Sequence, residues 1–366
     1  MYQHPVTGWT DGKRRGSCGV VNDVKLSVLD LVPVRTDQTS GDALAATIGL
    51  AQAADAAGLT RYWVAEHHNM PAVAATSPPV MIAMLGAHTE RIRLGSGGVM
   101  LPNHAPLAVA EQFALLEAAY PGRIDLGIGR APGSDPVTSY MLRAGRGDED
   151  IEKFPEYLDD VAALMSADGA RVQLPRQQYE LKATPAAVTE PSLWLLGSSM
   201  YSAHLAAAKG LPYVFAHHFS GQGTEEALAA YRAQFRPSDV ASEPRTFLTV
   251  NVVVADRDEE AAALALPNLQ NMARLRTGQP LAPLDLVEDA EAREVTPQMQ
   301  GLVDAGLARA VIGTPERASA EITALAERFA VDEVMLHPVA SARRGTDPRT
   351  SPARIATIEL LASAFR

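Results

Sequence analysis

Residues 26–34 read LSVLDLVPV, and this first apolar run distinguishes between two α/β architectures. An open, doubly wound sheet that binds dinucleotides carries a glycine-rich turn directly after its first strand. No such turn follows Leu31, because the chain continues into Val32 and Pro33. The sequence therefore favours a closed (β/α)8 barrel, the TIM-barrel fold.

Seven further short apolar runs follow, and Ala- and Leu-rich stretches of helical period separate them. Such alternation is typical of parallel strands joined by crossover helices. We therefore predict about eight βα repeats. The predicted strands are residues 26–31, 61–65, 92–100, 124–129, 193–197, 213–216, 247–254 and 333–337.

The chain is expected to form one domain. Residues 25–366 are assigned to a single barrel, and the polar, glycine-containing residues 1–24 to a flexible N-terminal extension. Two stretches near residues 131–191 and 257–309 exceed ordinary loop lengths and contain charged helical segments. We predict that both are insertions in the barrel rather than unstructured loops.

Composition excludes several classes of protein. The 366 residues include 32 Lys and Arg against 43 Asp and Glu, a net charge of −11. An acidic surface repels phosphate backbones and anionic lipids, which argues against nucleic acid or membrane partners. Cys18 is the only cysteine, and no apolar run reaches the length of a membrane span. We expect a cytoplasmic protein without disulfide bonds.

Catalytic residues of barrel enzymes lie where the strands end, so polar residues that close the apolar runs are candidates. The second run ends in Glu66, His67 and His68. Because side chains alternate along a strand, His67 and His68 are expected to point in different directions. Only one of them is expected to face a ligand, and the other then has a structural role.

The third and fourth runs end in small residues and one arginine. Ser96 and Gly97 lie among three glycines, which permit either the close approach of a flat ligand or a β-bulge. Arg130 closes the fourth run. Its guanidinium suits a phosphate or carboxylate, the alternative being a salt bridge to a nearby loop.

The fifth run leads into a helix through Ser198, Ser199 and Ser202. One serine suffices to cap a helix, whereas three favour an anion held at the helix start. His217 and His218 close the sixth run. A catalytic metal is not expected, because the first run lacks a His-x-His pair and no His-Glu-x-x-His helix is present.

Four segments together resemble the bacterial luciferase-like flavin monooxygenases from about residue 25 to the C-terminus. They are WVAEHH at 63–68, GSGGVMLP at 95–102, GRIDLGIGR at 122–130 and GLP at 210–212. The resemblance implies a (β/α)8 barrel that binds reduced FMN at the carboxyl ends of its strands. It also implies a homodimer.

The resemblance assigns roles to the candidate residues. His67 matches the catalytic histidine of luciferase, and Glu66 or His68 is expected to orient it. Ser96 and Gly97 match a non-prolyl cis peptide bond against the flavin. The expected phosphate contacts are Arg130, Ser198, Ser199 and Ser202.

The implied activity is a two-component monooxygenase, in which a separate reductase supplies reduced FMN and dioxygen oxidises a small organic substrate. Light emission is not expected, because the reactive cysteine of luciferase corresponds to Gly129. A deazaflavin-dependent hydride-transfer enzyme is one alternative. A non-catalytic flavin-binding relative is another, although it would not need the group at residues 66–68.

Overall fold

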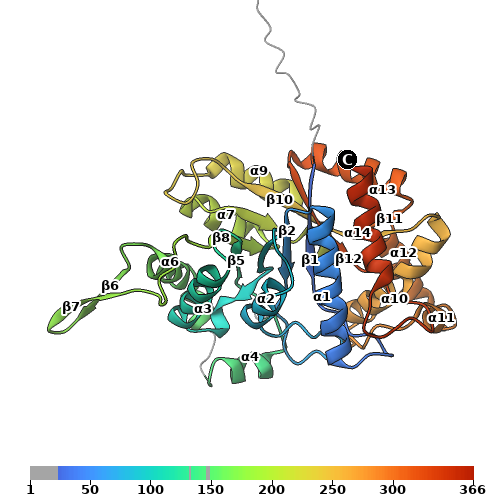
Figure 1. Cartoon of the computed structure of the whole chain (residues 1–366), viewed down its shortest axis with the longest axis horizontal. Coiled ribbons are helices and arrows are strands. Elements are labelled where there is room, and N and C mark those ends of the chain that lie inside the picture. Colours follow the sequence, from blue (N-terminus) through green and yellow to red (C-terminus); the bar gives the residue numbers. More distant parts are fainter. Residues whose placement is uncertain (1–23, 132, 146–148) are drawn as a thin grey trace, which may run out of the picture.

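A computed structural model describes residues 24–366 apart from residues 132 and 146–148, so the predicted extension lies outside the described residues except for Val24. Eight parallel strands pair side by side, and the last pairing, between β12 and β1, closes the barrel, which confirms the predicted TIM-barrel fold (Figure 1). In chain order the strands are β1 (Lys25–Asp30), β2 (Arg61–Val64), β3 (Arg93–Ser96), β5 (Ile124–Gly129), β8 (Ser192–Gly197), β9 (Tyr213–Phe215), β10 (Thr246–Val254) and β12 (Glu333–Pro338).

Helices surround the barrel. Their ends carry the capping residues that the sequence indicates: Gly58 and Gly210 follow their helices in the left-handed conformation, and Thr314 caps a helix that begins with Pro315. Within the described residues, no helix is both long and apolar enough to cross a bilayer. The surrounding helices are α1 (Ser40–Ala57), α2 (Pro78–Gly86), α3 (Pro106–Ala119), α6 (Phe154–Met165), α7 (Met200–Lys209), α9 (Thr224–Gln234), α13 (Pro315–Phe329) and α14 (Pro352–Ala364).

The chain between β5 and β8 contains the first of the two long segments. It holds α4 (Pro136–Leu142), α5 (Glu149–Glu152) and an antiparallel hairpin of β6 (Ala170–Leu174) and β7 (Gln177–Leu181) that projects from the barrel (Figure 1). The same segment includes α6, which packs against α3 in the helical layer. This segment therefore contributes α6 to the helical layer of the barrel as well as elements outside that layer. The limits of the insertion stay a prediction.

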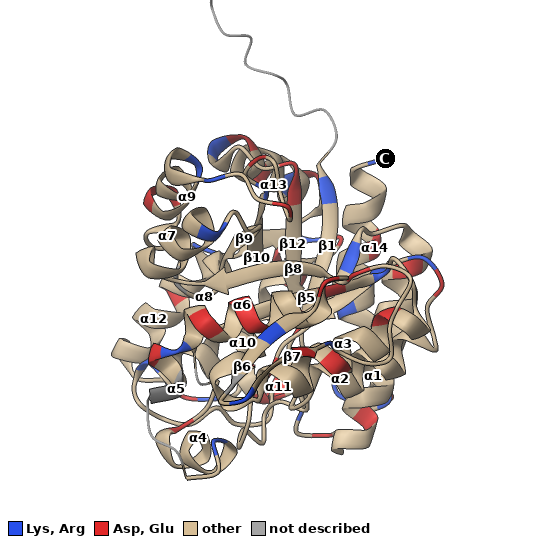
Figure 2. Ribbon diagram, turned by 90° about the vertical axis from the view of Figure 1, so that its left-hand side faces the viewer, with Lys and Arg blue, Asp and Glu red and all other residues tan. Residues whose placement is uncertain are grey.

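The second long segment lies between β10 and α13. It contains α10 (Asp258–Arg276), α11 (Val287–Glu291) and α12 (Pro297–Leu307), followed by β11 (Val311–Gly313), which pairs with β10. Helix α10 packs against α12, and the short helix α8 (His217–Ser220) lies on the same flank of the molecule (Figure 2). This segment therefore borders the barrel next to β9 and β10.

The third strand differs from the prediction. Residues 92–100 were expected to form one strand, but β3 ends at Ser96, and β4 (Val99–Met100) continues after an interruption, leading into the 3-10 turn η1 (Leu101–Asn103). The cis peptide bond joins Gly97 to Gly98 instead of Ser96 to Gly97. Ser96 is the last residue of β3, where it pairs with Val64. Its hydroxyl donates to Gly127 O at 2.8 Å and accepts from Gly127 N at 3.0 Å.

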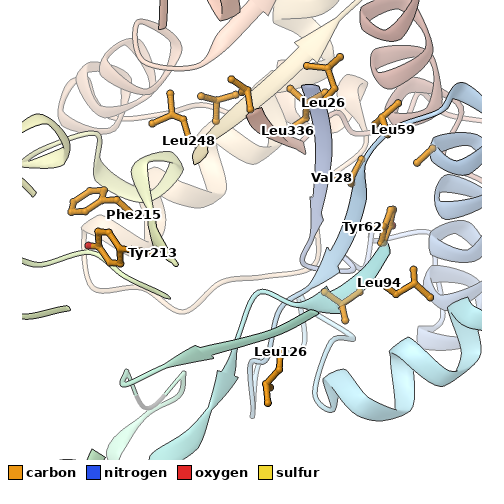
Figure 3. Packing of buried hydrophobic residues seen from close by; sticks show 14 of the residues in the cluster. Leu26, Val28, Leu59, Tyr62, Leu94, Leu126, Tyr213, Phe215, Leu248 and Leu336 are labelled. Atoms are coloured by element: carbon orange, nitrogen blue, oxygen red, sulfur yellow. The ribbon is translucent and has the colours of Figure 1, made fainter. Parts of the chain in front are cut away.

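The hydrophobic core has two layers. Between strands and helices, apolar residues from every part of the barrel pack together, among them Leu26, Tyr62, Leu126 and Leu336 (Figure 3). Inside the barrel, a smaller cluster centres on three aromatic rings, Trp63, Trp194 and Phe247, whose centroids are 5.0–5.8 Å apart. Edge and tilted contacts of this kind add to the stability gained from burial.

Charged residues occupy the barrel end where the strands begin. The Arg61 guanidinium donates to both carboxylate oxygens of Glu333 at 2.6 and 2.9 Å and to Asp125 at 2.8 Å. Asp125 also accepts from Arg93 and from the Trp63 indole. These hydrogen bonds compensate for the burial of the Arg61, Asp125 and Glu333 charges, which is required for buried ions to be tolerated.

Candidate active site

The opposite end of the barrel contains a cavity of about 330 Å³, called the mouth cavity below. Apolar side chains from the strand ends, the loop after β2 and α10 form most of its wall, and no charged residue is among its described lining residues. Such an apolar cavity with a few polar groups is typical of a site for a small organic molecule. Its polar lining consists of His67, His218, His337, Asn251, Asn268 and Asn271.

His67 is the candidate catalytic residue that lines the mouth cavity. It follows β2 and is fixed there by its backbone N–H, which donates to Ala75 O at 2.8 Å. Its Nδ1 is buried and has no hydrogen-bond partner within the described part of the chain. Burial lowers the pKa of His67, although the nearby Glu66 charge opposes this. A neutral imidazole with a free nitrogen can bind or exchange a proton with a ligand.

Glu66 and His68 form a different cluster. Glu66 Oε1 accepts from Nε2 of His68 at 2.9 Å and from Nε2 of His104 at 2.7 Å, and Oε2 accepts from Met100 N at 3.1 Å. Burial alone would raise the pKa of Glu66, but these hydrogen bonds lower it to about 2. Glu66 therefore joins the end of β2 to β4 and to the residue after η1.

This geometry corrects one expectation and agrees with another. Glu66 and His68 are hydrogen-bonded to each other and not to His67, so neither orients His67 as expected. The alternation of side chains after β2 does separate His67 from His68. Sequence reasoning missed His104, although it closes the same 95–104 stretch that supplied Ser96 and Gly97.

Two further residues of the mouth cavity were missed by sequence reasoning. His337 Nδ1 donates to Asn251 Oδ1 at 2.8 Å, and Asn251 Nδ2 donates to the backbone carbonyl of His218 at 2.8 Å. Burial lowers the pKa of His218 to about 4 and that of His337 well below its usual range. The signal was present, since His337 ends the last predicted strand just as His218 follows the sixth.

His217 does not line the mouth cavity. Its Nδ1 is hydrogen-bonded to Thr224 Oγ1 at 2.8 Å, and its ring packs edge-on to Phe329 with centroids 5.3 Å apart. Within residues 24–131, 133–145 and 149–366, no three His, Cys, Asp or Glu side chains are grouped so that they could hold a metal.

Arg130 and the start of α7 form a second polar feature at the same end of the barrel. The Arg130 guanidinium lies 4.1 Å from the ring centroid of Tyr201, in the first turn of α7. It has no carboxylate within 4 Å among the residues that the structure describes. Ser198 and Ser199 are exposed, and the Ser199 hydroxyl makes no capping hydrogen bond. Free hydroxyls, helix N–H groups and an unpaired guanidinium together suit a phosphate.

Two serines expected to contact the cofactor already have partners. Ser202 is buried, and its hydroxyl donates to Ser199 O at 2.8 Å and lies 3.2 Å from the Tyr213 hydroxyl. Ser96 is fully buried against Gly127. Gly97 does line the mouth cavity, and a Cβ there would lie 2.7 Å from Leu29 Cδ1. The side chains of Ser96 and Ser202 therefore support the fold, while Gly97 borders the site.

The sequence is similar to those of known proteins. The model of the family described as luciferase-like monooxygenase matches residues 24–333. The chain is 38% identical over 317 residues to a luciferase-like monooxygenase of Escherichia coli (strain K12), which covers 86% of this chain and 91% of the relative. It is 33% identical over 329 residues to the N-acetyl-S-alkylcysteine monooxygenase of Bacillus subtilis, covering 87% and 94%.

Solved structures show the same fold. The crystal structure of apo-MsnO8 matches with a TM-score of 0.81 and 35% identity, over 93% of this chain and 98% of that one. The oxygenating constituent of 3,6-diketocamphane monooxygenase from Pseudomonas putida, in complex with FMN, matches at 0.68 and 18% identity, over 93% and 97%. An F420-dependent secondary alcohol dehydrogenase matches at 0.62 and 16%, over 94% and 99%. The last two likenesses concern the fold alone.

Proposed function

The chain belongs to the luciferase-like monooxygenase family, and on that premise we propose that it binds reduced FMN and uses dioxygen to oxidise a small organic substrate. One observation carries the choice of a mononucleotide. Among the described residues Arg130 has no carboxylate partner, and it lies beside the open start of α7, where Ser198 and Ser199 are exposed. This set of donors fits a single terminal phosphate.

The proposal assigns one task to each part of the site. Arg130, Ser198, Ser199 and the first N–H groups of α7 hold the phosphate. Gly97 and the apolar wall of the mouth cavity accept the flat ring and the substrate and exclude water. Bound reduced flavin supplies the electrons that activate dioxygen.

His67 is then the residue that exchanges a proton with the reacting molecules. Because burial lowers its pKa, the imidazole is neutral at pH 7 and can accept a proton or a hydrogen bond at one nitrogen. His218 and His337 are neutral for the same reason, so the mouth cavity has three uncharged imidazoles. An uncharged wall favours a neutral or apolar reacting group.

The relatives support oxidation at an organic centre. The Bacillus subtilis relative is named for N-acetyl-S-alkylcysteine, a thioether, and the Pseudomonas putida protein for a bicyclic diketone. Thioethers and cyclic ketones are therefore the first compounds to test as substrates. A deazaflavin such as F420, named for a structural neighbour, is the second candidate cofactor.

The decisive experiment is an anaerobic titration of the protein with reduced FMN and reduced F420, followed by absorbance and fluorescence. We expect reduced FMN to bind more tightly. Arg130→Ala is expected to weaken it about ten- to hundredfold, since hydrogen bonds to charged groups contribute about 1.5–3 kcal/mol. Arg317→Ala, which removes an exposed arginine paired with Asp258, is the matched control. Preference for F420, or unchanged FMN affinity in Arg130→Ala, would overturn the proposal.

Three further expectations accompany this function: a separate flavin reductase, a cytoplasmic location and a homodimer. The dimer has a testable face, because Val80 on α2 and Leu115 on α3 are 59% and 58% exposed. Large exposed apolar side chains on adjacent helices suit a contact between two copies. Light scattering of the wild type and of a Val80→Glu, Leu115→Glu variant tests the assembly.

A further inference from the structure

A hollow of about 430 Å³ lies beside the mouth cavity. Phe219, Met272 and Leu275 line both, so the two spaces share a wall. A narrower void of about 40 Å³ touches His218 and Asn251 of the mouth cavity. It shares four lining residues with the hollow: Phe219, Met272, Arg276 and Arg309. The mouth cavity and the hollow are therefore neighbouring spaces on the same side of the barrel.

Arg276 and Arg309 give the hollow its charge, because both line it and both line the narrower void. No Asp or Glu is among the described lining residues of either space. The Arg276 guanidinium donates to the backbone carbonyl of Phe219 at 3.2 Å, and neither arginine has a carboxylate within 4 Å among the described residues. Burial and the neighbouring charge of Arg276 lower the pKa of Arg309, so the two cations repel one another.

Five other arginines of the chain do have a carboxylate partner. Arg293, Arg317, Arg328, Arg343 and Arg344 each face a carboxylate at 2.5–3.6 Å. In a chain with a net charge of −11, carboxylates are plentiful, yet within the part of the chain that the structure describes none lies within 4 Å of either guanidinium. Two like charges at one place with no counter-charge attract an anion from solution.

The fold explains how the two arginines meet. Arg276 is the last residue of α10, and Arg309 lies two residues beyond the end of α12. A cation is favourable at a helix C-terminus, which stabilises each arginine in its place. Helix α10 packs against α12 on the flank of the molecule where α8 lies (Figure 2). Arg276 and Arg309, at or just beyond the C-terminal ends of these two helices, therefore line the same hollow. Gly221, directly after α8, would place a Cβ only 3.7 Å from Arg309 Cδ.

We propose that Arg276 and Arg309 form a subsite for the carboxylate of an amphipathic substrate whose apolar part lies in the mouth cavity. The inference rests on the proposed function for the identity of the cavity as the substrate site. It adds the substrate class: a small organic acid with an apolar body. Neutral imidazoles and apolar residues contact the body, while the paired guanidinium groups hold the charged end.

The test uses two probes with the same eight-carbon chain and different head groups, the anion octanoate and the neutral 1-octanol, titrated calorimetrically into the full-length protein at pH 7.5. We expect octanoate to bind the wild type about tenfold more tightly than octanol. Arg276→Gln and Arg309→Gln should each weaken octanoate about fivefold, since a charge-assisted hydrogen bond is worth a kilocalorie or more per mole. The double variant should bind both probes equally, with octanol affinity unchanged.

Controls separate this inference from the proposed function. Arg317→Gln removes an exposed, paired arginine and should leave both probes unaffected. Thermal unfolding should give wild-type midpoints, because both arginines are exposed. Equal binding of the two probes to the wild type, or unchanged octanoate affinity in the double variant, overturns the inference.

FMN titration of the same variants distinguishes the source of the anion. Loss of FMN affinity in Arg276→Gln and Arg309→Gln, with octanoate unchanged, would assign the pair to the cofactor phosphate and overturn the subsite. If FMN fails to bind any variant while the octanoate preference persists, the proposed cofactor is wrong and the carboxylate subsite stands.

Discussion

The two ends of the barrel differ in whether their polar side chains have partners. Where the strands begin, Arg61, Asp125 and Glu333 are buried, and each charge has an opposite partner within 3 Å. Where the strands end, His67 Nδ1 has no partner in the described structure, and Arg130 faces an aromatic ring instead of a carboxylate. Partnered groups contribute to stability, whereas groups without partners are available to a ligand.

Glu66 shows that position alone does not decide the role. It lies at the mouth, directly before His67, yet three donors satisfy its carboxylate. Although burial raises its pKa, these hydrogen bonds and the nearby His104 lower it to about 2. Partner geometry is therefore the better guide to function than distance from the strand ends.

Arg61→Leu should produce the largest loss of stability. It leaves Glu333 buried with only the Ser27 hydroxyl, and Asp125 loses one of two arginines. Removing one partner of a buried ion pair costs about 3–5 kcal/mol of unfolding free energy. Denaturant titration measures this loss, and Arg317→Leu, at an exposed pair, should cost less than about 1 kcal/mol. Similar losses in the two variants would contradict the role given to the N-terminal end.

His218→Asn should have an intermediate, pH-dependent effect. The pKa of His218 is about 4 in the fold against 6.5 ordinarily, so the unfolded chain binds the proton more readily. This contribution to stability is complete above pH 6.5 and declines as the pH falls towards 4, by up to about 1.4 kcal/mol per pH unit. His337 acts in the same direction.

Unfolding free energies at pH 7.5, 6 and 5 test this prediction. The wild type should lose stability across the series more steeply than His218→Asn, which cannot take up the proton at this position. Parallel curves for the two proteins would show that His218 is not protonated on unfolding in this range.

His67→Ala should change stability least, by about 0.5 kcal/mol or less, because it removes a nitrogen with no partner in the described structure. Its effect on activity should be large. Loss of a positioned proton-transfer group slows a reaction about a hundredfold or more. Stopped-flow oxidation of the bound reduced flavin by dioxygen measures the rate. If His67→Ala is destabilised but oxidises the flavin at the wild-type rate, the role of His67 is structural.

The strands were predictable because each apolar run is short and a stretch of helical period separates it from the next, although residues 92–100 form β3 and β4 instead of one strand. The direction of His67 relative to His68 followed from strand alternation. Other features depend on contacts between distant segments. One partner of Glu66 is His104, 38 residues away, and the partner of the Ser96 hydroxyl is Gly127 on β5. The sequence at the end of one strand does not show which of its side chains will form hydrogen bonds with a distant segment.

The same limit explains the other differences. His337 was overlooked although it ends a strand, because only its neighbours Asn251 and His218 reveal a site there. Helices α11 and α12 lie between Arg276 and Arg309 in the sequence. Only the packing of α10 against α12 brings the two arginines to the same hollow. Sequence patterns identified the end of the barrel where chemistry takes place, and tertiary contacts selected the residues.

The aromatic cluster inside the barrel has an optical consequence. Trp63 and Trp194, two of the three tryptophans in the chain, are almost completely buried in contact with Phe247. Their indoles sit in the interior of the closed sheet, and only opening of the barrel brings them into water. Intrinsic emission from these two residues therefore reports on whether the barrel is closed, without any added label.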